Sequence, residues 1–208
     1  YEADLKDYLQ GLQGRERVRV VCIDLSSSYR SLVRKYFPNA KIVADRFHVV
    51  RLVLHRLIKT CQHVDLELKK QRGIARLLRK HKVNLTEKQA EKLDKYLKKH
   101  PQINAIYQFK EEMMKLLLHK KQTKKQCKKL IPQFLQAIEK LKLVGFEHCK
   151  KLAKTLQSWS EEIVRMWRFS KSNGITEGFH RKMKLIQRRA FGFKNFENYR
   201  KRVRVLCS

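Results

Sequence analysis

The sequence predicts a predominantly helical α/β protein in which two parallel strands carry a long all-helical region. Two β-branched segments, Val18–Asp24 and Lys41–Ala44, flank one helical segment. A crossover helix is the connection that a parallel strand pair requires, so the two strands are expected to run in parallel. From Arg46 onward the apolar residues keep a helical period for roughly a hundred residues, and helices therefore dominate the chain.

The segments around the two strands have clear starts and stops. Tyr1–Gln13 has the apolar spacing of an amphipathic helix. Val18–Asp24 is nearly continuous in apolar residues, which is typical of a strand covered on both faces. Ser26–Ser28 offer N-caps for the next helix, and Pro38 with Asn39 ends it. The chain is therefore expected to begin as helix, strand, helix, strand.

Capping residues divide the central region into several helices. Thr86 and Thr123 each precede a glutamine by three positions, which is the spacing of a capping box. Pro101 suits a first helical turn, whereas Pro132 is expected to kink or split its helix. Gly145–Phe169 is predicted to be one further helix. The apolar residues expected to face the core are Phe47, Val50, Val53, Leu54, Leu57, Leu152, Leu156, Trp159, Ile163 and Trp167.

The charge of the chain narrows the possible partners. Fifty Lys and Arg residues face 19 Asp and Glu residues, for a formal net charge of +31. So large an excess opposes compaction unless a polyanion lies beside the protein, and nucleic acid is the expected partner. No apolar run approaches the ~18–20 residues of a membrane-spanning helix, so no membrane partner is expected. The 42% apolar content excludes a disordered basic tail.

The potential metal-binding side chains give no zinc signature. The five cysteines are scattered, odd in number and without a Cys-x-x-Cys pair, which favours a reducing compartment over a disulfide framework or a zinc ribbon. His48, His55 and His63 are spaced loosely enough to be ordinary helix residues rather than zinc ligands.

A single acid lies in a basic helix near the C-terminal end of the sequence. A helix that starts near Ser172 or Asn173 turns about 100° per residue. One face then carries Glu177, Arg181, Lys184 and Arg188, and the opposite face carries Ile175, Phe179, Met183 and Ile186. A carboxylate on a basic face is what a metal-dependent nuclease needs where it meets a phosphodiester backbone. The alternative is a simple ion pair between Glu177 and Arg181.

Two further acids follow the predicted strands. Asp24 ends the first strand and Asp45 follows the second. Ligands of open parallel sheets gather beyond the carboxyl ends of the strands, and Mg²⁺ prefers oxygen ligands, so these acids and a helical glutamate could together hold this ion. The alternative is that each acid caps a helix. Ser26 or Ser27 could replace Asp24 in that role, while Asp45 is well placed to cap the helix that begins at Arg46.

Three ordered motifs resemble bacterial insertion-sequence transposases of the ISL-three family. The motifs are Val21–Arg30, Phe37–Val49 and the segment from Thr176 to Arg200, which includes Arg188-Arg189-Ala190-Phe191-Gly192-Phe193. The similarity extends over essentially the whole chain. The three motifs in this order are far more specific than any one of them alone.

The resemblance implies a partial RNase H-like fold with an Asp-Asp-Glu metal triad and a helical insertion before the last acid. Asp24 would be the second acid and Glu177 the third, separated by 153 residues. The implied domains are residues 1–70 as part of the nuclease core, 71–168 as the helical insertion and 169–208 as the helices that complete the core. Nothing before Val18 matches the strand of the first acid, so the chain is expected to be the C-terminal part of a transposase, with an unpaired apolar edge on the Val18–Asp24 strand.

The resemblance also implies the chemistry and the partners. The activity would be cleavage and transfer of DNA strands with Mg²⁺ or Mn²⁺, with Asp24 bridging two ions and Glu177 holding one. The residues implied to contact DNA are Arg181, Lys182, Lys184, Arg188, Arg189, Lys194 and Arg200, and those implied to support the site are Asp45, His48 and His180. The partner would be double-stranded DNA at transposon ends. The complete protein would be a homo-oligomer in the bacterial cytoplasm, associated with the nucleoid.

Two other hypotheses stay open at this point. The chain could be a basic helical module that binds nucleic acid without catalysis, or a helical assembly domain that dimerises through the segment from Trp159 to Trp167. The transposase hypothesis differs from both because it predicts that the carboxylates of Asp24 and Glu177 lie within about 8 Å of each other. Asp45 is then expected to lie farther off and to cap its own helix.

Overall fold

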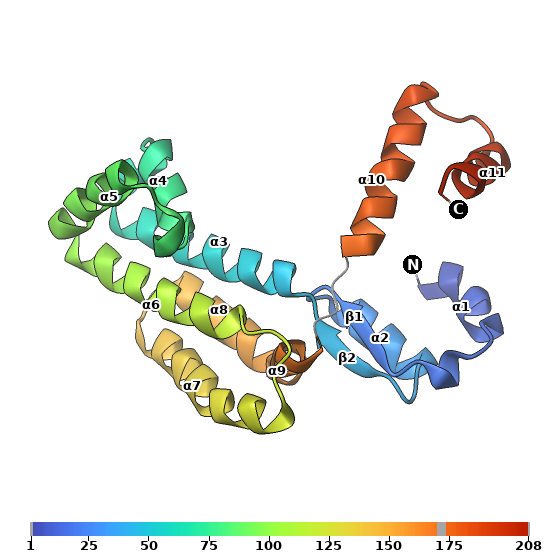
Figure 1. Cartoon of the computed structure of the whole chain (residues 1–208), viewed down its shortest axis with the longest axis horizontal. Helices are drawn as coiled ribbons and strands as arrows, with labels where there is room; N and C mark the ends of the chain where they lie inside the picture. The colour runs from blue at the N-terminus through green and yellow to red at the C-terminus, as the bar shows by residue number, and fades with distance from the viewer. Residues whose placement is uncertain (1, 170–173, 208) are drawn as a thin grey trace. The chain divides into compact units, whose positions relative to one another are not determined.

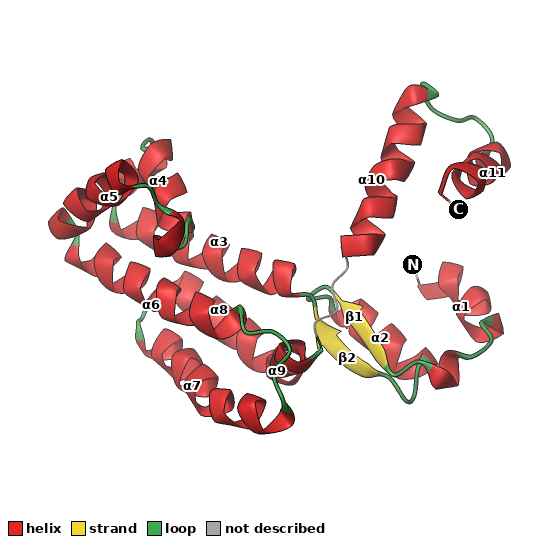
Figure 2. Ribbon diagram, in the orientation of Figure 1, coloured by secondary structure: helices red, strands yellow, loops and turns green. Residues whose placement is uncertain are grey.

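Helices dominate the chain, and a small parallel sheet is the one β element among the described residues (Figure 2). The structure is a computed structural model that describes residues 2–169 and 174–207. It divides into two units, Tyr1–Lys171 and Ser172–Ser208, each of which is described by itself. None of the described helices is both long enough and apolar enough to cross a bilayer.

The first unit contains the sheet and a series of helices (Figure 1). It begins with α1 (Glu2–Gly11), η1 (Arg15–Arg17), β1 (Val20–Ile23), α2 (Ser27–Tyr36), β2 (Lys41–Ala44) and α3 (Arg46–Val64). It continues with η2 (Leu66–Lys69), α4 (Arg72–Arg79), η3 (Lys82–Asn84), α5 (Glu87–Lys99), α6 (Pro101–Leu117), α7 (Lys124–Leu143), α8 (Glu147–Ser158) and α9 (Ser160–Arg168). The second unit contains α10 (Gly174–Arg189) and α11 (Phe196–Cys207).

The two strands form the predicted parallel pair. Val20 is opposite Lys41 and Ile23 is opposite Ala44. The crossover helix α2 begins after Ser26, whose hydroxyl oxygen accepts a hydrogen bond from the Tyr29 N–H at 3.4 Å. β1 is shorter than the predicted Val18–Asp24 segment, because pairing with the four residues of β2 sets its length.

The two strands are buried to different extents. Ile42, Val43 and Ala44 of β2 are buried, and α9 packs against this strand. In β1 only Ile23 is buried, because α9 packs against β2 and far less of the helical bundle covers β1. β2 therefore anchors the sheet to the helices, and β1 is its less protected strand.

The long helix α3 begins directly after β2. The Asp45 carboxylate caps it by accepting a hydrogen bond from the Phe47 N–H at 2.8 Å, as predicted. Its buried stripe runs through Val49, Val53 and Leu57. The expectation that Phe47 faces the core was wrong, because this side chain is off the stripe and 57% exposed.

The middle of the first unit is a helical bundle in which α3 packs on α6 and α8, and α7 packs on α8. The predicted capping box at Thr123 is complete, since Thr123 and Gln126 bond each other's backbone N–H groups at 3.2 and 2.8 Å. At Thr86 only half of the box forms. The side-chain oxygen of Gln89 accepts instead from Lys80 Nζ at 3.0 Å. Both helices nevertheless begin where the sequence predicts.

One prediction about helix continuity was wrong, and one is narrowed. The segment 145–169 is not one helix: α8 ends at Ser158, and α9 begins at Ser160. Trp159 separates them with a non-helical backbone, and its ring is buried under the guanidinium of Arg30, 3.5 Å from the ring centroid. Pro132 was expected to kink or split its helix, and α7 is not split there, while the kink stays a prediction. The proline removes one backbone donor, and the packing of the helix offsets that loss.

Arg46 ties the start of α3 to the ends of two other helices. Its Nη1 donates to the carbonyls of Leu118 at 3.2 Å and His119 at 2.6 Å, after α6. Its Nη2 donates to the carbonyl of Met166, in α9, at 2.5 Å. A cation suits these carbonyls because the last C=O groups of a helix lack partners and carry partial negative charge. The residue next to Asp45 is thus fixed by the helical bundle.

The second unit is a helix pair. α10 ends in a Schellman turn, in which the Gly192 N–H donates to the Gln187 carbonyl at 3.0 Å and Phe191 and Gly192 have positive φ. Asn195 caps α11 by accepting from the Glu197 N–H at 2.8 Å. The rings of Phe193 and Tyr199 lie 5.2 Å apart, so the connection between the helices is held by aromatic contact.

Candidate functional site

Three potential metal ligands converge at the carboxyl edge of the sheet. β1 ends one residue before Asp24, and β2 ends one residue before Asp45. The Asp45 N–H donates to the Ile23 carbonyl at 2.7 Å, which holds the two strand ends side by side. One ligand atom each of Asp24, Asp45 and His48 lies within 4.8 Å of the others. Two parallel strands and one helix start therefore build a single acidic cluster.

His48 completes this cluster from the first turn of α3. Its Nδ1 lies 3.1 Å from an oxygen of Asp24 and 3.9 Å from an oxygen of Asp45, which are ion-pair distances when the imidazole is protonated. The exposed fractions of the side chains are 40% for Asp24, 28% for His48 and 3% for Asp45. The cluster is thus anchored at Asp45 and open to solvent at Asp24.

Negative charge is concentrated around this cluster. Burial raises the pKa of the Cys22 thiol on β1, and the charges of Asp45 and Asp24 raise it too, to about 12 in all. The N-terminus of α3 opposes these charges, because the first turn of a helix carries partial positive charge. Two carboxylates held this close together attract a cation.

The donor set fits a hard divalent cation. Carboxylate oxygens are the ligands that Mg²⁺ and Mn²⁺ prefer, and an imidazole nitrogen is accepted by Mn²⁺ more readily than by Mg²⁺. Asp45 uses one hydrogen bond to cap α3, but a carboxylate has two oxygens and several lone pairs. Asp24, Asp45 and His48 are therefore the residues of the first unit that could hold a metal ion.

The structure confirms one expectation about Asp45, and another stays a prediction. Asp45 caps its own helix as predicted. It also lies in one cluster with Asp24, and the expectation that it is farther from Glu177 than Asp24 is stays a prediction. His48 is likewise not an ordinary helix residue, because it pairs with Asp24. The sequence signal for this grouping was the position of both acids directly after parallel strands.

Glu177 lies in the first turn of α10, in the second unit, and is partly exposed. Among the described ion pairs none joins it to Arg181, so the alternative of a simple salt bridge finds no support there. Ser172 and Asn173, the predicted caps, and the side chain of Ile175 lie outside the described residues. The approach of Glu177 to Asp24 stays a prediction.

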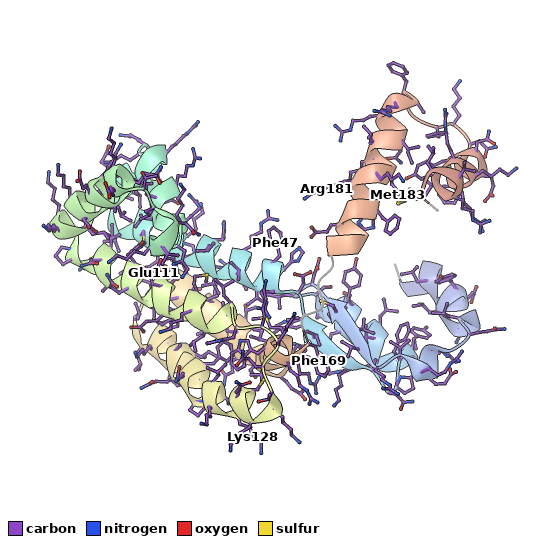
Figure 3. The ribbon with its side chains drawn as sticks, in the orientation of Figure 1. Phe47, Glu111, Lys128, Phe169, Arg181 and Met183 are labelled. Atoms are coloured by element: carbon purple, nitrogen blue, oxygen red, sulfur yellow. The ribbon has the colours of Figure 1, made fainter. Side chains whose placement is uncertain are left out.

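The residues of the second unit predicted to contact DNA are exposed. They are Arg181, Lys182, Lys184, Arg188, Arg189, Lys194 and Arg200, and His180 is exposed with them. Figure 3 labels Arg181 and Met183 on α10, and of these two only Met183 is partly buried. On the face predicted to be apolar, Ile186 is buried whereas Phe179 is exposed. α10 therefore presents cations to solvent along most of its length.

No sequence pattern indicated the charged pair that joins the crossover helix α2 to α9. Arg30 Nε lies 3.1 Å from a carboxylate oxygen of Glu162, which is buried in α9. Both tryptophans of the proposed assembly helix, Trp159 and Trp167, are buried within the first unit. They are therefore not available as a dimer interface.

Comparison with known proteins adds independent information. A family model described as Transposase, for the ISL-three type of DDE transposases, matches residues 1–203. The transposase for insertion sequence element IS1001 of Bordetella parapertussis is 24% identical over 204 residues, which cover 91% of this chain and 48% of that protein. The chain thus spans about half the length of this relative. No solved structure matches the chain.

Proposed function

Because this chain belongs to the ISL-three family of transposases, we propose that it forms part of a DDE-type core that cuts and joins DNA strands. Family membership supports a role in transposition and does not favour a nucleic-acid-binding module without catalysis. The observation that carries the catalytic proposal is the cluster of Asp24, Asp45 and His48 at the carboxyl edge of the sheet. Such an edge is where open parallel sheets bind their ligands.

The proposed site gives each residue a separate role. Asp24 and Glu177 hold the metal, and Asp24 is the more exposed member of the first-unit cluster. Asp45 is buried, and the hydrogen bond that its carboxylate accepts from the Phe47 N–H holds it in place. We therefore assign it a supporting role in the site. His48 contacts Asp24 and holds that carboxylate in place. Bound Mg²⁺ or Mn²⁺ would acidify the attacking hydroxyl and stabilise the leaving oxygen of the phosphodiester.

The exposed cations of α10 and α11 would position the DNA. Arg188 and Arg189 are both exposed at the end of α10. Contacts of arginine with phosphate fix the register of a duplex and carry no base sequence, so these residues would orient transposon ends without recognising them. In the complete protein we expect a homo-oligomer that acts at the bacterial nucleoid.

Iron-mediated cleavage of the protein backbone tests the ligand set without requiring activity. Fe²⁺ takes the place of Mg²⁺, and ascorbate with peroxide then produces hydroxyl radicals that cut the protein close to the bound ion. We expect cuts near residues 24, 45 and 177. Asp24→Asn should remove all three cuts, and Glu177→Gln should remove the cut in α10. The matched control Glu197→Gln, at an exposed acid of α11 paired with Arg200, should change none.

The same map distinguishes the proposal from a site built by the first unit alone. A cleavage map in Glu177→Gln that equals that of the original chain, the cut in α10 included, would exclude Glu177 as a ligand and would make Asp45 the second carboxylate ligand. Absence of cuts at all three positions would contradict metal binding by this cluster.

A further inference from the structure

The solvent-facing side of α3 carries a row of basic side chains that the proposed site does not use. Arg51, His55, Lys59 and His63 follow each other at four-residue intervals, and all four are exposed. Residues four apart lie on the same face of a helix, about 6 Å apart along its axis. The 19 residues of α3 include no Asp or Glu. We call these four residues the α3 ridge.

Neighbouring helices widen the ridge with more cations. α4 and α8 both pack against α3. The pKa of His55 is lowered first by partial burial and then by the positive charges of Lys59, Arg56, Arg79 and Arg51. The pKa of His148, on α8, is lowered by partial burial and then by Arg56, Lys151, Lys59 and His63. Arg79 of α4 and Lys151 of α8 therefore add positive charge beside α3, while Glu147, which pairs with Lys151, also acts on His148.

Ion pairs between neighbouring turns occur on α7, α8 and α9 but, among the described residues, not on the α3 ridge. In α7, α8 and α9 a glutamate pairs with a lysine or arginine three or four residues later, as in Lys142–Glu139 at 2.6 Å, Lys151–Glu147 at 3.1 Å and Arg165–Glu161. Among the described residues, Arg51 and Lys59 form no ion pair. Like charges four residues apart destabilise a helix, so local helix stability does not explain the ridge.

The ridge begins at the candidate site. His48 precedes Arg51 by three residues and lies on the same side of the helix. Figure 1 shows α3 leading away from the sheet, past α6 and α8, towards α4. At 19 residues the helix is about 28 Å long, which corresponds to roughly eight base pairs of duplex DNA.

We propose that the α3 ridge binds the phosphate backbone of duplex DNA and leads it to the cluster of Asp24, Asp45 and His48. Arg51 and Lys59 belong to no described ion pair, and their regular spacing along α3 matches a regularly charged polyanion. Arginine, lysine and histidine side chains directed at phosphates position the duplex without reading its bases. That the duplex is delivered for cleavage rests on the proposed function, whereas backbone binding by the ridge does not.

Removal of two ridge charges tests the proposal. Arg51→Gln/Lys59→Gln keeps side chains that favour helix, and thermal unfolding should match that of the original chain. Binding to a 20-base-pair duplex of arbitrary sequence is measured by fluorescence anisotropy over a range of salt. We expect the slope of log affinity against log salt to fall by about two units, and affinity at 0.1 M salt to fall roughly ten- to a hundredfold.

The matched control removes the same charge from another helix. Lys125→Gln/Lys128→Gln changes two exposed lysines of α7, a helix that packs on α6, α8 and α9. Figure 3 labels Lys128. We expect affinity to change less than about threefold, because only long-range attraction is lost.

Equal losses in the two double variants would overturn the proposal, since they would show that only net charge matters. A ridge variant that loses more affinity for an RNA duplex or for anionic lipid vesicles than for DNA would assign the ridge to that partner instead. The iron-mediated cleavage map should be unchanged in the ridge variant. The cleavage map tests the metal-site proposal and the DNA titrations test the ridge proposal. A negative result for one is therefore distinguishable from a negative result for the other.

Discussion

Asp24 and Glu177 are two acids of one proposed site, and the chain supports them in very different ways. Asp24 follows β1, which pairs with the buried strand β2. It also contacts His48 in α3, the helix whose Arg46 donates a hydrogen bond to the Met166 carbonyl of α9. Glu177 lies on α10, which has α11 as its packing partner within the second unit. The position of Asp24 is thus set by long-range packing, whereas that of Glu177 is set by one helix.

Because the two acids are supported differently, substitutions near each of them should have different effects. Substitutions around Asp24 act on the fold and on the metal site together. Substitutions on α10 act on a metal ligand or on DNA contacts, while the first unit stays folded. Each of the following predictions tests that separation.

The largest effect is expected on DNA cleavage. In a transposase that contains this chain, Asp24→Asn and Glu177→Gln should each reduce divalent-metal-dependent strand cleavage by roughly a thousandfold, because loss of a ligand removes several kcal/mol of transition-state stabilisation. Gel assays of cleavage with Mg²⁺ or Mn²⁺ measure this. DNA affinity should stay intact in both variants. A cleavage rate in Glu177→Gln equal to that of the original protein would show that the second unit contributes no metal ligand to the catalytic site.

The next effect is on stability of the first unit. Arg46→Ala should lower the free energy of unfolding by about 3 kcal/mol, since it leaves the carbonyls of Leu118, His119 and Met166 without their charged donor. Urea unfolding followed by circular dichroism measures the change. Arg76→Ala, at an exposed position of α4, is the control and should change stability little. Equal stability of the two variants would show that Arg46 does not anchor the site.

A smaller effect is expected from the basic end of α10. Arg188→Ala/Arg189→Ala should lower the slope of log DNA affinity against log salt by about one to two units, roughly one for each phosphate contact. Titrations at several salt concentrations measure the slope. Glu177→Gln should not weaken binding, because it removes a negative charge that repels phosphate. An unchanged slope in the double variant would place both arginines away from the DNA.

The smallest effect is a pH dependence of DNA binding along α3. Partial burial lowers the pKa of both imidazoles, and nearby cations lower it further. Lys59, Arg56, Arg79 and Arg51 act on His55, and Arg56, Lys151, Lys59 and His63 act on His148, which Glu147 also faces. Phosphates would favour the protonated imidazoles, so DNA binding takes up protons and affinity rises as the pH falls from 7.5 through the histidine range. We expect a few-fold change.

The double variant His55→Gln/His148→Gln tests this assignment. Affinity measured between pH 5.5 and 7.5 should depend less on pH in this variant than in the original chain. The same pH dependence in both proteins would show that other groups take up the protons.

The sequence by itself determined the local features and the family. Ser26, Asp45 and Thr123 were recognised as helix caps, and Pro101 as a first-turn residue, because a cap bonds a backbone group only two or three positions away. The strand pair followed from two β-branched segments around one helix. The ordered motifs indicated the ISL-three transposases, which the family match confirms.

The tertiary structure alone decided which residues meet and which side chains are buried. Helical periodicity marks apolar positions but does not say which of them the neighbouring helices cover, and Phe47 is therefore exposed while Val49 is buried. The break at Trp159 depends on the ring of that residue packing under Arg30, which is far away in the sequence. Asp45 and His48 join Asp24 because strand pairing and the start of α3 bring separate segments together. Such contacts depend on long-range packing, which the spacing of residues along a single chain does not encode.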